Sequence, residues 1–105
     1  MEFTILERIT LQELLPKQED YVTMKIIRDL RMELSFSEKE IKDFEINQTN
    51  SHITWNTVKE KKKKIDIGET AHSIICEALK KADKEKKINE QNISLYEKFI
   101  LTIKQ

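Results

Sequence analysis

Apolar residues at helical spacing follow short capping signals in the first third of the chain. Thr10 and Glu13 match a capping box, and Pro16 would end the short helical turn that they begin. Asp20 is a typical N-cap for a second helix, whose apolar side chains cover about 140° if each residue turns by about 100°. These apolar residues are Val22, Ile26, Ile27, Leu30 and Leu34. The pattern predicts a helix with one buried side.

A third helix is expected to begin at Ser37. Glu40 completes a capping box with Ser37, and Phe36 is placed to pack on Ile41 as a hydrophobic staple. Phe44 marks the far end of this helix, because the apolar spacing changes there.

Beyond this point the apolar residues stand two apart, which is typical of strands. The pairs with this spacing are Phe44 and Ile46, Ile53 and Trp55, and Ile65 and Ile67. Residues 47–51 are all polar and favour turns, so a hairpin should join the first two strands. The apolar run 3–6 is too short to separate a fourth strand from a helix.

Two further helices are expected after Gly68. The first carries apolar residues on one side, namely Ala71, Ile74, Ile75, Ala78, Leu79 and Ala82. Asn89 would cap the second, whose inward face would be Ile93, Tyr96, Phe99, Ile100 and Ile103. The predicted fold is a single α+β domain over residues 1–105, with N-terminal helices, a small and mainly antiparallel three-stranded sheet, and a C-terminal helical hairpin.

Composition then narrows the range of functions. The 105 residues include one Gly, one Pro, one Cys and two His. Phosphate-cradling loops need several glycines, metal sites need clustered Cys and His, and nucleophilic triads need a histidine beside an activated hydroxyl or thiol. We therefore expect that the protein is not an enzyme, and that it has no catalytic residues and no cofactor.

The sequence also predicts a cytoplasmic location. No apolar run approaches the roughly 20 residues of a membrane span, and an unpaired Cys76 fits a reducing compartment.

One cluster on the predicted long helix contains residue types that can bind a metal ion. Glu69, His72 and Cys76 are three and four residues apart and would share one side of the helix. A metal site would need matching ligands on another element, and the other histidine, His52, lies on a predicted strand or its edge. The favoured interpretation is a capping Glu, a border His and a small buried thiol, with no metal bound.

Charge is balanced overall but not along the chain. Residues 1–58 hold 7 Lys and Arg against 11 Asp and Glu, whereas residues 59–105 hold 12 against 8. The strongest local feature is a run of lysines, Lys61, Lys62, Lys63 and Lys64. These lysines predict either a solvated loop or, as the alternative function, a nucleic-acid-binding site. The arginines that would read base edges all lie in the acidic half, which favours the first interpretation.

A single residue suggests a contact with a protein partner. Leu101 falls opposite the predicted buried side of the last helix, so another chain would have to cover it. With few groups left for chemistry, protein binding is the expected activity, and a second copy of the chain is among the candidate partners.

Four segments carry a resemblance to known sequences. They are LSFSEKE at 34–40, ITWN at 53–56, IDIGE at 65–69 and LYEKF at 95–99. Taken in order, they resemble small uncharacterised proteins encoded in phages and prophages of low-GC Gram-positive bacteria. The resemblance implies a non-enzymatic accessory protein in the cytoplasm of a bacterial host cell, either an assembly factor or an inhibitor of a host protein.

Overall fold

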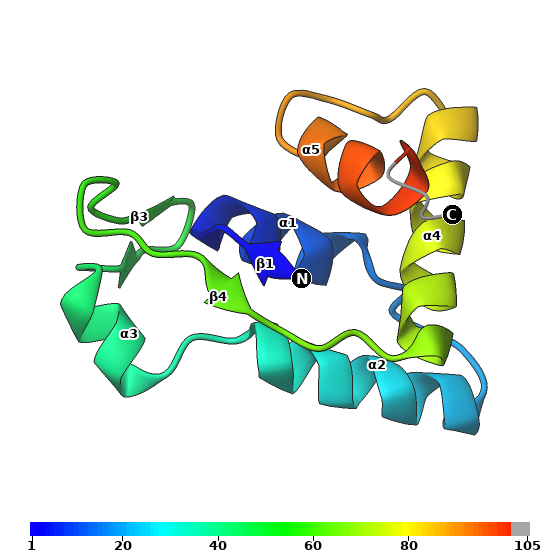
Figure 1. The fold of residues 1–105 in the computed structure, drawn as a ribbon, viewed down its shortest axis with the longest axis horizontal. Helices are drawn as coiled ribbons and strands as arrows, with labels where there is room; N and C mark the ends of the chain where they lie inside the picture. The colour runs from blue at the N-terminus through cyan, green and yellow to red at the C-terminus, as the bar shows by residue number, and fades with distance from the viewer. Residues whose placement is uncertain (102–105) are drawn as a thin grey trace.

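The computed structural model describes residues 1–101 and combines helices with short strands (Figure 1). In chain order the elements are β1 (Glu2–Phe3), α1 (Ile5–Leu14), α2 (Tyr21–Leu34), α3 (Glu38–Asp43), β2 (Asn47–Gln48), β3 (Ile53–Thr54), β4 (Lys63–Lys64), α4 (Glu69–Lys84), α5 (Ile93–Tyr96) and a π-helical turn, η1 (Glu97–Leu101). The predicted α+β class is confirmed, with helix as the main component.

The predicted three-stranded sheet is wrong. β2 and β3 form the expected antiparallel hairpin, but β4 pairs with β1, so the described residues contain two separate two-stranded sheets. Phe44 and Ile46 were expected in the first strand of this hairpin, but β2 begins at Asn47, within the predicted turn. Glu45 has a φ of 55°, a left-handed conformation that interrupts extended backbone before β2. Ile65 is buried as its alternating pattern suggested, yet it follows β4 as extended chain that packs into the core.

The first helix begins earlier than predicted. Thr4 is its N-cap: Thr4 Oγ1 accepts from the backbone N–H of Glu7 at 3.1 Å, and Glu7 Oε1 accepts from that of Thr4 at 3.0 Å. Residues 4–7 and 10–13 both read Thr-x-x-Glu. The pattern at Thr10 predicts a helix start there, but Thr10 lies buried inside α1.

The predicted starts of the next two helices are confirmed. Asp20 Oδ1 accepts from the backbone N–H of Thr23 at 2.8 Å, and Ser37 forms the expected capping box. On α2 the buried residues are Ile27, Leu30 and Leu34, as predicted. Val22 is 67% exposed, so its assignment to the buried side was wrong.

The last helix also differs from its prediction. It begins after Asn92, because the Oδ1 of Asn89 accepts from the N–H groups of Gln91 and Asn92 and forms a turn before the helix. The shift exposes Ile93 (46%) and buries the Leu95 that follows it, while the prediction that Phe99 faces inward is confirmed. Ile103, which was also expected to face inward, lies outside the described residues.

The core lies between α1, α2, α4 and the C-terminal helical segment. Its buried members are Phe3, Leu11, Leu15, Ile27, Leu30, Leu34, Ile65, Ile75, Leu79, Leu95 and Phe99. Neither α3 nor the β2–β3 hairpin contributes to this core cluster, and Figure 1 shows both at the end of the molecule away from α4. Other contacts must therefore hold them in place.

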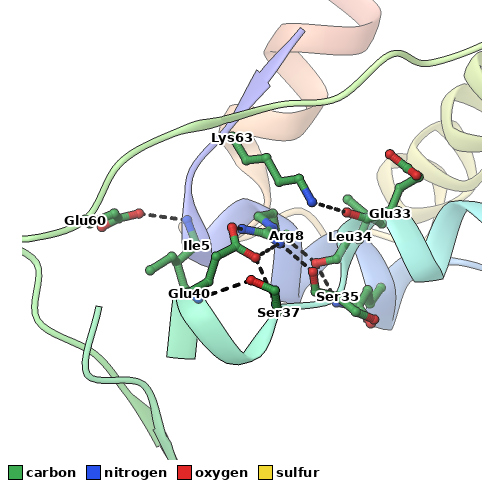
Figure 2. A network of polar contacts seen from close by, with 10 residues as sticks. Ile5, Arg8, Glu33, Leu34, Ser35, Ser37, Glu40, Glu60 and Lys63 are labelled. Atoms are coloured by element: carbon green, nitrogen blue, oxygen red, sulfur yellow. Dashed lines mark hydrogen bonds and ion pairs between the residues drawn. The ribbon is translucent and has the colours of Figure 1, made fainter. Parts of the chain in front are cut away.

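A buried arginine supplies such contacts (Figure 2). Arg8 of α1 is fully buried, and its Nε and Nη2 donate to the carbonyl oxygens of Leu34 and Ser35 at 3.1 and 2.6 Å. The guanidinium also binds both carboxylate oxygens of Glu40 on α3, at 2.7 and 3.1 Å. One side chain thus joins α1 to the C-terminal end of α2 and to the N-terminal turn of α3.

Three further polar contacts fasten the neighbouring segments. Arg31 of α2 donates to the carbonyl of Gln12 at 2.9 Å, near the C-terminal end of α1. Glu60 Oε2 accepts from the backbone N–H of Ile5 at 2.7 Å, and Lys63 Nζ donates to the carbonyl of Glu33 at 3.2 Å (Figure 2). Glu60, between β3 and β4, and Lys63 of β4 are therefore tied to the ends of two helices.

Replacing Arg8 should destabilise the fold strongly. Arg8→Ala removes both guanidinium hydrogen bonds to the Glu40 carboxylate and the donor to the Ser35 carbonyl, and breaking a buried ion pair costs about 3–5 kcal/mol. Arg28→Ala is the matched control, because the Arg28 side chain is 65% exposed and sits 3.9 Å from Asp29. That variant should lose less than about 1 kcal/mol. Urea unfolding measures both, and equal losses would contradict the structural role of Arg8.

The same ion pair predicts a pH dependence of stability. Hydrogen bonds from Arg8 hold the pKa of Glu40 at about 2, below the ordinary value of 4.5, although partial burial opposes the shift. A carboxyl with a lowered pKa in the folded state stabilises above its unfolded pKa, and this contribution is lost as pH falls from about 4.5 towards about 2. Glu40→Gln should remove this part of the pH profile of unfolding free energy. In an Arg8→Ala background the same substitution should change the profile little.

Candidate functional site

The four lysines of the nucleic-acid alternative lie in and just before β4. Lys63 is half-buried and binds the Glu33 carbonyl, whereas Lys61, Lys62 and Lys64 are exposed. One of the four is therefore engaged in holding the fold. Nucleic-acid binding by these lysines stays a prediction.

Acidic groups lie beside these lysines. Lys59 Nζ forms an ion pair with Glu45 Oε2 at 2.8 Å, and this hydrogen bond raises the pKa of Lys59 and lowers that of Glu45. Glu60 turns inward, where its Oε1 accepts from Trp55 Nε1 at 3.2 Å. The two acids thus bind Lys59, Trp55 and the Ile5 backbone, and not the four lysines of the run.

Of the candidate metal ligands Glu69, His72 and Cys76 on α4, the structure brings His72 and Cys76 together. Cys76 Sγ lies 3.5 Å from His72 Nδ1 and 3.7 Å from the carbonyl oxygen of Phe99, to which it donates. The His72 ring packs against the Phe99 ring, with 5.2 Å between their centroids. Glu69 is exposed in the first turn of α4, and residues 1–101 contain no group of three or more His, Cys, Asp or Glu placed to hold a metal ion. The pair packs α4 against η1.

Cys76 should react slowly with alkylating agents in the folded protein. Burial raises the pKa of its thiol, and the nearby charge of Lys80 opposes this only in part. The thiolate is the reactive form, so its fraction at neutral pH falls below that of a free cysteine. We expect iodoacetamide to label Cys76 at least about tenfold more slowly in buffer than in urea. Labelling at equal rates would show that the thiol is freely accessible.

A shallow groove lined mainly by apolar side chains lies between α1, α3 and the β2–β3 hairpin. It has a volume of about 480 Å³, and we call it the apolar groove. Its apolar lining residues are Ile9, Phe36, Ile41, Ile46 and Ile53. None of the five is fully buried, and Ile41 is 43% exposed. Glu13 is the charged residue in the lining. Water therefore covers apolar surface here that the core does not use.

Each side of the groove comes from a different local structure. Ile9 projects from α1, Phe36 lies between α2 and α3, and Ile41 lies on α3. Ile46 and Ile53 belong to the hairpin. The guanidinium carbon of Arg8 lies 4.2 Å from the centroid of the Phe36 ring, so the buried ion pair also positions one wall.

The sequence identifies the apolar residues that line the groove, but it does not predict that they lie together. The sequence pattern places Phe36 and Ile41 in a hydrophobic staple, and Ile46 and Ile53 in two strands joined by a hairpin. The available signal was that the hairpin and third helix carried apolar residues without a predicted partner element. The juxtaposition with Ile9 depends on contacts of Arg8 that span up to 32 residues.

Leu101, the predicted partner contact, is 66% exposed at the end of η1. Its exposure agrees with the expectation, and its role in binding stays a prediction.

Within residues 1–101 no helix has the length and apolar character needed to cross a membrane. Comparisons of the chain with family models, with curated proteins and with solved structures find no match.

Proposed function

We propose that this chain is a non-enzymatic accessory protein of the cytoplasm that acts by binding another protein through the apolar groove. The observation that carries the proposal is the set of five apolar side chains gathered around about 480 Å³ of open space. Contiguous apolar surface on a small protein commonly marks an interaction site, since covering it releases ordered water.

The construction of the groove supports binding by a preformed surface. Phe36 is held by Arg8, and Arg8 is fixed by the carbonyls of Leu34 and Ser35 and by Glu40. A wall that is already ordered needs little further loss of conformational freedom when a partner docks. The fitting ligand is an apolar segment with a basic residue beside it, because Glu13 supplies a carboxylate in the lining.

The biological setting that we propose follows from the sequence resemblance. Four short segments resemble proteins of phages and prophages from low-GC Gram-positive bacteria, in which small binding proteins assist assembly or inhibit host proteins. An apolar docking surface suits either role, because both depend on occupying a site on another protein.

A peptide selection tests the groove directly. Displayed random peptides selected on the full chain should be enriched in apolar residues next to Lys or Arg. Ile41→Glu should weaken their binding by at least about tenfold, which corresponds to about 1.4 kcal/mol. Val58→Glu is the matched control, because Val58 is 91% exposed and lies outside the groove lining.

Fluorescence titration of the selected peptides against the parent chain, Ile41→Glu and Val58→Glu gives the three dissociation constants. Circular dichroism establishes that both variants keep their helices. Equal binding by Ile41→Glu and the parent chain would refute the groove as the docking site.

A further inference from the structure

We propose that a second copy of this chain fills the apolar groove with its C-terminal end around Leu101, so that copies associate head to tail. The inference rests on the proposed function, because it names the occupant of the same groove. It connects two exposed apolar features that lie on different parts of one molecule.

The donor surface is held firmly by the fold. Leu101 ends η1, and two residues earlier Phe99 is buried in the core. Cys76 Sγ donates to the Phe99 carbonyl at 3.7 Å, which ties this turn to α4. The exposed Leu101 side chain is thus presented by an anchored segment, which limits the entropy lost on docking.

Charge complementarity favours this donor. Leu101 belongs to residues 59–105, which hold 12 Lys and Arg against 8 Asp and Glu. Lys80 follows Cys76 by one helical turn, so it lies on the side of α4 that packs against η1. The groove offers Glu13 and belongs to residues 1–58, which hold 7 basic against 11 acidic side chains. A basic apolar end would meet an acidic apolar groove.

The contact has to form between copies. Figure 1 shows η1, drawn in red, beside α4, whereas α3 and the β2–β3 hairpin lie at the opposite end of the molecule. Two different surfaces then meet, which makes the interface heterologous. Such an interface leaves one groove and one end free after each addition, so assembly continues beyond a dimer or closes into a ring.

Light scattering after size-exclusion chromatography tests the arrangement with full-length chains. The average mass of the parent protein should rise with concentration and exceed twice the monomer mass. Ile41→Glu in the groove and Leu101→Glu at the donor end should each stay monomeric, and Glu13→Lys serves as a second groove variant. Val58→Glu, an equally drastic change at an exposed site, should assemble like the parent.

An equimolar mixture of Ile41→Glu and Leu101→Glu gives the decisive result. The mixture contains one intact groove and one intact end per pair, so it should form dimers and nothing larger. A parent chain that stays monomeric, or a mixture that gives no dimer, overturns the head-to-tail proposal. The peptide selection reports on the groove independently, so peptides that bind the groove of a strictly monomeric chain would leave the proposed function standing.

Discussion

Burial of the Arg8 guanidinium is the constraint from which the arrangement of the amino-terminal half follows. Removing a cation from water is costly unless its N–H groups find acceptors. Arg8 meets this need with two carbonyls at the end of α2 and with the Glu40 carboxylate. Among the described residues no buried side-chain nitrogen or oxygen lacks a hydrogen-bond partner. The polar contacts therefore fix the turn between α2 and α3, which the hydrophobic core does not reach.

The same contacts connect stability to the surface that we propose as functional. α3 has no buried residue, so it is placed by the Arg8–Glu40 ion pair and its capping box more than by apolar packing. The groove lies between α1, α3 and the hairpin, and Phe36 rests on Arg8. Apolar side chains can thus remain open to water without loss of structure, because their positions do not depend on being covered.

Local signals predicted the fold where they were unambiguous. Asp20 and Ser37 were identified as caps because each precedes a clear apolar pattern, and both make the expected hydrogen bonds. The first helix was misplaced because Thr-x-x-Glu occurs twice, and the long-range contact of Glu60 with the Ile5 N–H at the true start is not visible in the sequence. The groove and the buried Arg8 could not be predicted, since both arise from residues far apart in sequence. An arginine in an acidic segment ordinarily indicates exposed surface.

The pairing of β1 with β4 has a consequence for the order in which the chain can fold. Glu2 lies opposite Lys64, and Glu7 accepts from Lys98 at 3.0 Å, so the amino-terminal turn depends on residues that a ribosome adds much later. Long-range closure of this kind slows folding, because loop entropy is lost before the contacts form. During synthesis these contacts can form only after Lys64 and Lys98 have been added, whereas the contacts of α1 with α2 can form earlier.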